Sequence, residues 1–386
     1  MSAGRLRSAK VVAAVVWVVV MALAGAAFAQ HRRHREPVVP AAGLTAVRTL
    51  GDYFAPLKRT VHDSNVYLFD SGTPGGTIMV IGGNHPEEPA GSLAAQVLVE
   101  NLAVSRGRVV VVIHANRSAS TVTRPGDAYP RFFHIETPHG TARFRMGDRW
   151  TNPLDSWPDP EVYIHYPSRQ SLAYMDIRNL NRTFPGRPNG SAAEQVAYAL
   201  MRVIAAEHVD LFLDLHEAEL EYPVIGTIVS HQNAVRVAAV VSMELSATKF
   251  RIGMEYSPVN LHGLTHREVG DHSPALALLA ETPEPFLDRV RGVTDEALLL
   301  TGRDAFVMKA GEHHLLYWPI DEHGWPIAQR VGRHTETFLK ICDVWSRQHP
   351  QRAITVSGVP GYTELLARGV GAFFHDPARG GRVVHE

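Results

Sequence analysis

The stretch GTIMVIGGNHPEEPAG, residues 76–91, joins a short apolar run to a polar segment rich in glycine and proline. The run at 76–83 is bounded by glycines, which is typical of a buried strand. From Glu88 to Leu102, leucine and valine recur at helical spacing. A histidine and two glutamates therefore stand where a strand gives way to a helix. Such a segment is either an ordinary polar loop or part of a metal site, and the rest of the chain has to distinguish the two.

The alternation of strand and helix continues along the chain. Apolar runs at 108–116, 209–216 and 274–281 predict further buried strands. Between them, 191–208 predicts an amphipathic helix that begins with a Ser-x-x-Glu capping box, and 231–247 predicts another helix. Strands that are apolar throughout favour a mainly parallel or mixed central sheet covered by helices on both faces. The sequence therefore predicts an α/β fold.

Composition narrows the class of protein. The chain has 386 residues, of which 45% are hydrophobic and 20% are charged, so it can bury a sizeable core. A net charge of −1 provides no basic field for nucleic acid, and we expect no nucleic-acid partner. Cys342 is the single cysteine, which excludes internal disulfides and cysteine-based zinc sites. Any metal ion must be held by histidines and carboxylates.

The first 29 residues have the pattern of a targeting segment. Basic residues within the first ten positions precede a long apolar run, and Ala27, Phe28 and Ala29 form an A-x-A cleavage pattern. We interpret 1–29 as a cleaved signal peptide. The alternative is an uncleaved membrane anchor, because the run is nearly long enough to span a bilayer. Both interpretations predict an exported protein, periplasmic or secreted, that contacts a membrane only if the segment is retained.

The remaining chain divides into three predicted parts. Residues 30–60 are basic and contain prolines, which is typical of a linker, and 61–310 carry the alternating strands and helices of a main domain. Within that domain, 124–174 is a long insertion without clear periodicity, and its aromatic content favours an ordered loop that covers a site. Residues 311–386 form an unassigned C-terminal extension that looks helical at 334–348.

Three candidate metal ligands follow predicted strands. His85 and Glu88 come after the run at 76–83, and His216 closes the run at 209–216. Sites in open α/β sheets gather beyond the carboxyl ends of strands, so these side chains can converge. Two imidazoles, one carboxylate and a water form a catalytic zinc site with an open position, and we expect about one Zn²⁺ per chain. Taken alone, His-x-x-Glu is better explained by a polar loop with a glutamate at a helix start.

A second motif lies at 175–186, MDIRNLNRTFPG, where two arginines and an asparagine surround a leucine. The planar fork of arginine can hold a carboxylate through two hydrogen bonds. The motif therefore predicts a groove for a small-molecule or peptide substrate with a free carboxylate. A solvated basic loop is the alternative.

GGNHPEE, RNLNRTFPG and DLHEA, in that order, resemble the succinylglutamate desuccinylase and aspartoacylase branch of the zinc carboxypeptidase superfamily. The resemblance covers roughly residues 75–290 and implies a zinc carboxypeptidase-like fold. It implies that the zinc ligands are His85, Glu88 and His216.

The same resemblance assigns substrate-binding residues. Asn181 and Arg182 correspond to the family's Asn-Arg pair, which binds the substrate carboxylate or its polarised carbonyl. The family has another arginine upstream, for which Arg178 is the first choice and Arg124 the second.

The resemblance also implies a glutamate general base at the end of a late apolar strand. Glu281, in PALALLAETPEP, occupies that position. Glu268, in HREVGD, is the rival, since an E-V-G triplet resembles the base motif of some members but here lacks the preceding apolar strand. Either glutamate would take a proton from the attacking water and return it to the leaving amine.

Several neighbouring residues keep two interpretations. Pro86 stands where the family usually has glycine, which stiffens the loop and leaves Glu87 as an alternative ligand to Glu88. Asp214 shares a strand face with His216, so it either orients that ligand or is a charge-satisfied residue below the site. The histidines around Glu268 either line the pocket or belong to a surface loop; these are His262, His266 and His272.

Together these features predict an exported zinc metallohydrolase that cleaves an amide bond next to a carboxylate, as an N-acyl amino acid deacylase does. A metallocarboxypeptidase acting on peptides or peptidoglycan fragments is the first alternative. A non-catalytic carboxylate-binding module is the alternative from another class. The stretch RFRMGDRWTNPLDSW, 143–157, has no counterpart in typical small-molecule deacylases, so the substrate remains open.

Overall fold

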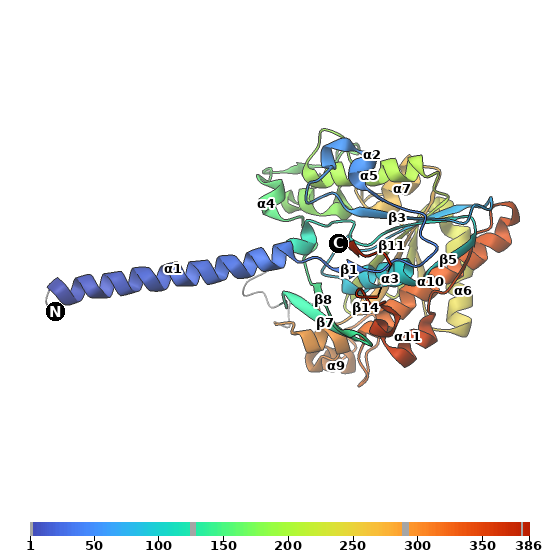
Figure 1. The fold of residues 1–386 in the computed structure, drawn as a ribbon. Coiled ribbons are helices and arrows are strands. Elements are labelled where there is room, and N and C mark those ends of the chain that lie inside the picture. Colours follow the sequence, from blue (N-terminus) through green and yellow to red (C-terminus); the bar gives the residue numbers. More distant parts are fainter. Residues whose placement is uncertain (1–2, 124–128, 288–292, 380) are drawn as a thin grey trace. The chain divides into compact units, whose positions relative to one another are not determined.

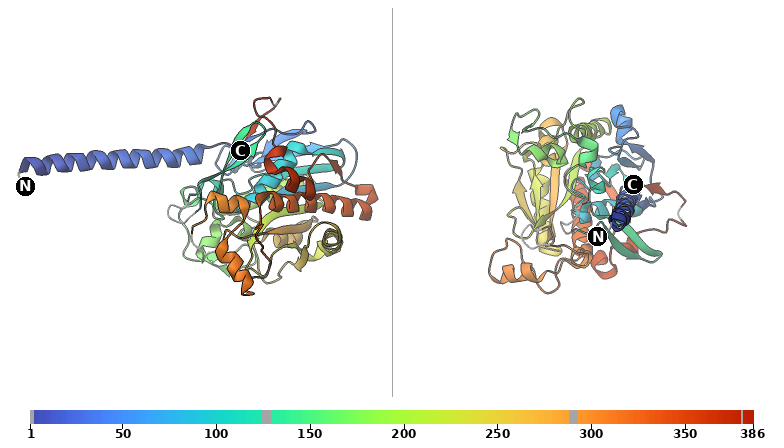
Figure 2. Two further views of the ribbon diagram at one scale, coloured as in Figure 1. Left: turned by 90° about the horizontal axis from the view of Figure 1, so that it is seen from below. Right: turned by 90° about the vertical axis from the view of Figure 1, so that its left-hand side faces the viewer.

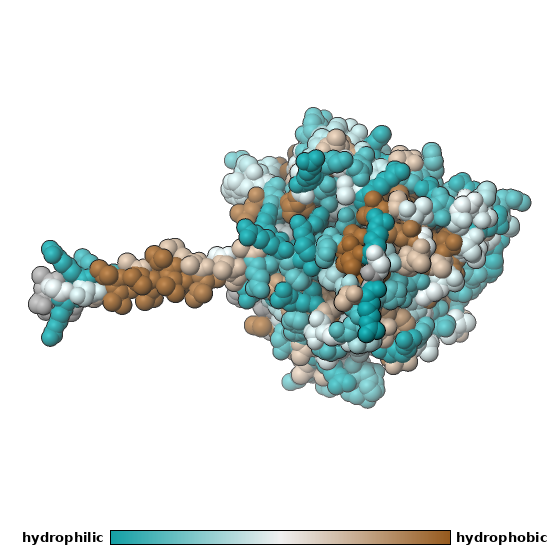
Figure 3. Space-filling view, viewed as in Figure 1, coloured by the Kyte–Doolittle hydropathy of each residue, from teal (hydrophilic) through white to brown (hydrophobic). Residues whose placement is uncertain are grey.

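The computed structural model describes residues 3–123, 129–287, 293–379 and 381–386. The chain divides into two units, Met1–Arg35 and Glu36–Glu386. The first unit contains one helix, α1 (Ala3–Arg33), whose segment Arg7–Arg33 is long and apolar enough to cross a membrane. Figure 3 shows this apolar band next to a polar N-terminal end. Length and composition fit a signal sequence as well as an anchor, so cleavage after residue 29 stays a prediction.

A mixed sheet of eight strands forms the centre of the second unit. Its strands are β2 (Ala46–Thr49), β3 (Asn65–Asp70), β4 (Thr77–Ile81), β6 (Arg108–Val112), β11 (Leu211–Glu219), β12 (Thr227–Ser230), β13 (Gly253–Tyr256) and β14 (Leu276–Glu284). They lie in the order β13-β12-β14-β11-β4-β6-β3-β2. The run from β14 to β6 is parallel, whereas β12 and β3 join it in antiparallel pairing. The predicted α/β fold with a mainly parallel or mixed sheet is confirmed.

The parallel strands are buried because their sequences are apolar on both faces. All five residues of β4, TIMVI, are buried, as are the four valines of β6. β-branched side chains suit the pleated, enclosed backbone of such strands. The strands predicted at 76–83, 108–116, 209–216 and 274–281 are all present.

Helices cover both faces of this sheet, as Figures 1 and 2 show. One face packs against α2 (Leu50–Tyr53), α5 (Ala192–Ala206) and α7 (Thr265–His272). The other packs against α3 (Pro89–Asn101), α6 (Val235–Thr248) and α10 (Ile327–Gln348). The predicted capping box of α5 is confirmed, since Ser191 Oγ accepts from Glu194 N and the Glu194 carboxylate accepts from Ser191 N.

Smaller elements attach the outer segments to this core. They are β1 (Pro37–Val38), β5 (Ala103–Arg106), β7 (Phe132–Thr137), β8 (Gly140–Arg145), α4 (Pro153–Ser156), β9 (Tyr163–Ile164), β10 (Ser171–Leu172), α8 (Glu296–Thr301), α9 (Ala305–Glu312), β15 (Thr355–Ser357), α11 (Tyr362–Arg368) and β16 (Val384–His385). β1 pairs with β16, and β5 pairs with β15. The second unit therefore includes most of the predicted linker, 30–60, and the whole predicted extension, 311–386.

A buried ion pair links α10 to the centre of the sheet. Arg330 Nη1 lies 2.7 Å from Glu217 Oε1, and both side chains are fully buried. Arg330 Nε also donates to the carbonyl of Trp325 at 2.9 Å, while Glu217 Oε2 accepts from Ala90 N at 2.7 Å. Burial raises the pKa of Glu217, and Arg330 opposes that effect. The pair thus connects β11, the first turn of α3 and the C-terminal helix.

Replacing this arginine tests how much the pair stabilises the fold. Arg330→Met should lower the free energy of unfolding by about 3–5 kcal/mol, because it leaves the Glu217 charge buried without a partner. Urea unfolding of the full chain measures the change. The double variant Arg330→Met, Glu217→Gln should recover part of the loss. Lys340→Met, on the same helix but in a solvent-facing pair with Glu244, should cost only about 0–1 kcal/mol. Equal stabilities of the Arg330 and Lys340 variants would contradict the assignment.

Candidate active site

Three parallel strands bring the predicted site residues to one edge of the sheet. β11 pairs with β14 so that His216 stands opposite Glu281. On its other side β11 pairs with β4, with Asp214 opposite Ile81. The segment after β4 therefore enters the same edge and carries His85 to it. The convergence expected beyond the carboxyl ends of the strands is present.

Glycines allow the sharp passage from β4 into α3. Gly83 has φ of 59°, in the left-handed region that glycine adopts at little cost. A Cβ on Gly91 would collide with the carbonyl oxygen of Leu215, so α3 and β11 approach each other backbone to backbone. This close packing holds the polar loop between them against the end of β11.

His85, Glu88 and His216 form a buried cluster. One ligand atom from each lies within 4.8 Å of the others. His85 Nδ1 lies 2.7 Å from Glu88 Oε1, and His216 Nδ1 lies 2.8 Å from Glu88 Oε2. The carboxylate thus faces one nitrogen of each imidazole.

The other nitrogen of each imidazole is held by an oxygen. His85 Nε2 lies 2.9 Å from Asn179 Oδ1, and His216 Nε2 lies 2.9 Å from Asp214 Oδ2. Because these oxygens accept, each ring donates from Nε2, which leaves Nδ1, the nitrogen next to Glu88, as the atom able to bind a metal ion. Metal-binding histidines are oriented in this way. The contacts support the interpretation that Asp214 orients His216, and they assign a matching role to Asn179, which the sequence did not reveal.

Asp214 is itself fixed on several sides. Its Oδ2 accepts from Asn84 Nδ2 at 2.8 Å and from Thr265 Oγ1 at 2.7 Å. Although burial opposes ionisation, His216 and these donors lower the pKa of Asp214. The carboxylate is therefore charged and immobile behind the ring of His216.

The electrostatics of the cluster fit a divalent cation. Burial opposes the charge of Glu88, but His85 and His216 lower the pKa of its carboxyl well below the usual value. Burial lowers the pKa of His85, which favours the neutral ring that binds metals, whereas Asp214 and Glu88 outweigh burial and raise the pKa of His216 well above its usual value. Two Nδ1 atoms and one ionised carboxylate are a donor set suited to Zn²⁺.

A cavity of about 530 Å³ opens over the cluster. Its polar wall includes residues from several elements, namely Arg149, Asn181, Arg182, Glu219, Tyr222, His266 and Glu281. Its apolar wall includes Val224, Val229, Leu261, Leu264 and Leu279. This size and mixed lining are typical of a site for a small molecule.

Glu281 lies in the cavity wall beside His216. Its Oε2 is buried and has no hydrogen-bond partner among the described residues. Desolvation raises the pKa of Glu281 to about 8, with a smaller opposing effect from His216 and a supporting one from Glu88. A carboxyl group whose oxygen has no fixed hydrogen-bond partner can accept and return a proton. A nearby cation would favour its charged form.

Two arginines enter the cavity. Arg182 donates from Nη1 to the carbonyl of Asn181 at 2.7 Å, and burial lowers its pKa. Arg149 pairs through Nε with Glu87, and its Nη2 lies 3.7 Å from Glu88 Oε1. Burial opposes the charge of Arg149, but Glu87 and Glu88 raise its pKa above the usual value.

The contribution of Arg149 was not predicted. The only signal in the sequence was the aromatic insertion that contains it, which was expected to cover a site. Glu87, the alternative ligand, is instead the partner of Arg149 and lies outside the ligand cluster.

Other predicted residues lie elsewhere. Arg178 pairs with Asp159 at 2.9 Å and is absent from the described cavity lining. Glu268 lies on α7, also outside that lining, with Oε1 2.8 Å from His262 Nδ1. Arg124 lies outside the described residues. The structure thus brings His85, Glu88, His216, Asn181, Arg182 and Glu281 together, but not Arg178 or Glu268.

The ligand set can be tested by metal content. His216→Ala should reduce the bound zinc by about one equivalent per chain, because it removes one of three protein ligands. Elemental analysis of the full chain, purified without chelator, measures the loss. His313→Ala removes an exposed imidazole and should change nothing. Unchanged zinc in the His216 variant would show that the ligands are wrongly assigned.

Comparison with known proteins supports the predicted resemblance. Residues 165–261 match the family described as succinylglutamate desuccinylase/aspartoacylase catalytic domain, a segment that contains Asn181, Arg182 and His216. The N-alpha-acetyl-L-2,4-diaminobutyric acid deacetylase of Halomonas elongata is 28% identical over 159 residues, which are 41% of this chain and 33% of that protein. The match therefore spans about a third of the curated relative.

Two solved structures are similar at lower identity. A succinylglutamate desuccinylase from a Silicibacter species is 17% identical, with a TM-score of 0.35, over 57% of this chain and 53% of that one. A metallo-carboxypeptidase from Pseudomonas aeruginosa in complex with (2-guanidinoethylmercapto)succinic acid is 14% identical, with a TM-score of 0.41, over 80% and 66%. The predicted resemblance to the desuccinylase and aspartoacylase branch is confirmed, and part of the chain is similar to a deacetylase.

Proposed function

We propose that the protein is a zinc-dependent hydrolase that cleaves an amide bond in a small N-acylated molecule with a free carboxylate. One observation carries the proposal: a single cavity contains a His-Glu-His ligand set, an unpartnered glutamate oxygen and two arginines. The family match over 165–261 supports the same class of reaction.

The ligand cluster would hold the metal. Zinc bound by His85, Glu88 and His216 would lower the pKa of a water towards neutrality and polarise the substrate carbonyl. The protein contributes the orientation of the donors, because Asn179 and Asp214 keep both Nδ1 atoms directed at the same point.

Glu281 would act as the general base and then as the acid. Its carboxylate takes a proton from the attacking water and returns it to the leaving amine. The parallel register of β11 and β14 sets Glu281 opposite His216, so the proton acceptor stands on the strand next to a metal ligand. Glu268 is enclosed in other contacts and is absent from the described lining of the cavity.

Each of the two arginines would interact with a different group of the substrate, one with the free carboxylate and the other with the carbonyl oxygen. Arg182, with the side-chain amide of Asn181, would bind the free carboxylate in the cavity. Arg149 lies nearer to the ligand cluster, 3.7 Å from Glu88, and would stabilise the charge that develops on the carbonyl oxygen. The predicted role of Arg178 would then pass to Arg149.

We further propose that the reaction takes place outside the cytoplasm. The apolar helix α1 supports this location, whether it is a cleaved signal or an anchor.

If Glu281 is the general base, replacing it should affect turnover but not metal binding. Glu281→Gln should retain zinc but lose about 10²- to 10⁴-fold in kcat, since the amide cannot accept the proton. Hydrolysis of a panel of N-acyl amino acids and short peptides, with chelated protein as the blank, measures the effect and identifies the substrate class. Glu268→Gln should reduce kcat far less. A larger loss of kcat in Glu268→Gln than in Glu281→Gln would assign the base role to Glu268. Zinc-loaded protein that hydrolyses no member of the panel would favour a non-catalytic binding module.

The arginines predict different kinetic defects. Arg149→Met should lower kcat by about 10²- to 10³-fold, because it removes stabilisation of the transition state. Arg182→Met should mainly raise KM, because it removes a contact that the bound substrate already makes. Steady-state kinetics on the best substrate distinguish the two. Arg178→Met is the matched control, and a larger loss in this variant than in Arg149→Met would restore the original assignment.

A further inference from the structure

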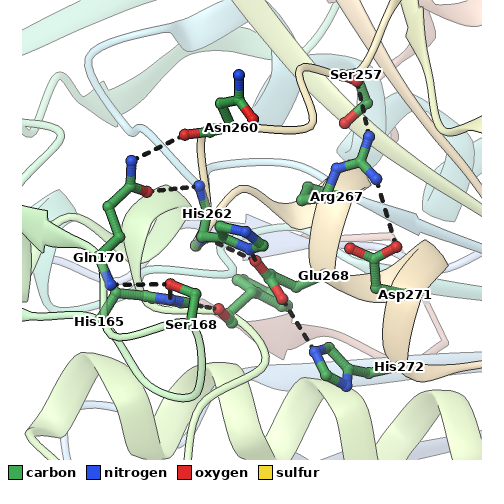
Figure 4. A network of polar contacts seen from close by, with 12 residues as sticks. His165, Ser168, Gln170, Ser257, Asn260, His262, Arg267, Glu268, Asp271 and His272 are labelled. Atoms are coloured by element: carbon green, nitrogen blue, oxygen red, sulfur yellow. Dashed lines mark hydrogen bonds and ion pairs between the residues drawn. The ribbon is translucent and has the colours of Figure 1, made fainter.

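A second group of metal-type ligands lies outside the cavity lining. His165, His262 and Glu268 each provide one nitrogen or carboxylate oxygen, and these atoms lie within 4.8 Å of one another. Within the described ranges, this cluster and the one at the candidate active site are the two that meet this criterion. Figure 4 shows the network that surrounds it.

The three side chains come from two segments that are far apart in sequence. His165 follows β9 in the β9–β10 hairpin, His262 precedes α7, and Glu268 lies within α7. His165 and Glu268 are each 1% exposed, whereas the side chain of His262 is partly open to solvent. The cluster is therefore enclosed on one side and accessible to an ion from the other.

We propose that His165, His262 and Glu268 bind a second divalent cation of the zinc type, with a structural rather than a catalytic role. The proposal concerns a separate set of residues and does not depend on the proposed function.

One imidazole–carboxylate pair of this cluster has the spacing seen in the first cluster. His262 Nδ1 lies 2.8 Å from Glu268 Oε1, compared with 2.7 Å and 2.8 Å for the two imidazole–carboxylate pairs around Glu88. Two imidazoles and one carboxylate are again the donors, a combination that zinc favours over calcium or magnesium. The same chemistry is thus assembled twice in one chain.

The hydrogen bonds of His165 leave Nδ1 as the nitrogen that could bind a metal ion. Its Nε2 lies 2.6 Å from the carbonyl oxygen of Phe184, which can only accept, so Nε2 carries the proton. Nδ1 therefore holds the lone pair, and it faces the hydroxyl of Ser168 at 2.7 Å. A hydroxyl can rotate away when a cation arrives. A backbone carbonyl on the second ring nitrogen is a common feature of metal-binding histidines.

Glu268 is held with equal firmness. Its Oε1 accepts from Gly263 N at 3.0 Å, and its Oε2 lies 3.1 Å from His272 Nε2. Each oxygen of this buried carboxylate therefore faces an imidazole nitrogen. In Figure 4, His262 and His272 approach the carboxylate from different sides.

A cation bound here would stabilise one wall of the candidate active site. Leu261 and Leu264, which flank His262, line the cavity. Gly263 lies so close to Arg182 that a Cβ would collide with its carbonyl, and the Gly263 carbonyl accepts from Phe184 N at 3.2 Å. Fixing His262 to His165 and Glu268 would therefore hold this loop against the segment that carries Arg182.

Metal content of five full-length proteins tests the proposal. Wild type, purified without chelator and dialysed against Zn²⁺, should hold about two zinc ions per chain. The double variant His85→Ala, His216→Ala should hold about one, at the second cluster. His262→Ala should also hold about one, and combining all three substitutions should leave none. His323→Ala, which removes an exposed imidazole, should keep two.

A spectroscopic measurement covers the case in which His262→Ala does not fold. Co²⁺ titrated into metal-stripped His85→Ala, His216→Ala protein should give one equivalent of tetrahedral d–d absorption, and the conservative variant His262→Gln should abolish it. The proposal is overturned if wild type holds a single zinc ion that the active-site variants remove completely, or if His262→Gln leaves the cobalt spectrum unchanged. Two bound metals without amide hydrolysis would support the second site while contradicting the proposed function.

Discussion

Strand β11 forms parallel hydrogen-bonded pairs with β4 on one side and β14 on the other, and this register determines the site. It sets His216 opposite Glu281 and Asp214 opposite Ile81. Since side chains alternate between the faces of a strand, a slip of one residue would turn His216 away from its partners. Asp214 and Glu217 oppose such a slip, because it would turn each buried carboxylate away from its partner. The chemistry therefore depends on the packing of the strand that carries it.

The charges around β11 show how this strand tolerates so many ionisable groups. Glu217 is paired with Arg330, and Asp214 receives hydrogen bonds from two neutral donors and faces His216. Glu281 has no equivalent partner for its buried oxygen. Buried charges without partners are costly, and burial accordingly raises the pKa of Glu281 to about 8. A carboxyl group that can gain or lose a proton near neutral pH is what a general base would require.

The sequence predicted the central strands, the α5 capping box and the ligand candidates, because each depends on local signals: apolar runs, helix caps and residues at strand ends. It did not indicate Arg149, Asn179 or Arg330. Arg149 comes from an insertion without periodicity, and Asn179 resembles any loop asparagine. Arg330 belongs to the C-terminal extension, 311–386, which the sequence left unassigned. These residues act through contacts between distant segments, which no local pattern records. For the same reason, the sequence offered Arg178 and Glu268, whose motifs fit but whose positions lie outside the described cavity lining.

The ion pair between Arg330 and Glu217 also has a consequence for the order in which the molecule matures. Glu217 is made 113 residues before its partner during synthesis, and β11 cannot bury it favourably until α10 arrives. The sheet edge that carries His216 would therefore stay loosely closed while the chain is still incomplete. The candidate active site would be fully assembled only after α10 has been synthesised and has docked on the sheet, so a helix late in the sequence sets when the site forms.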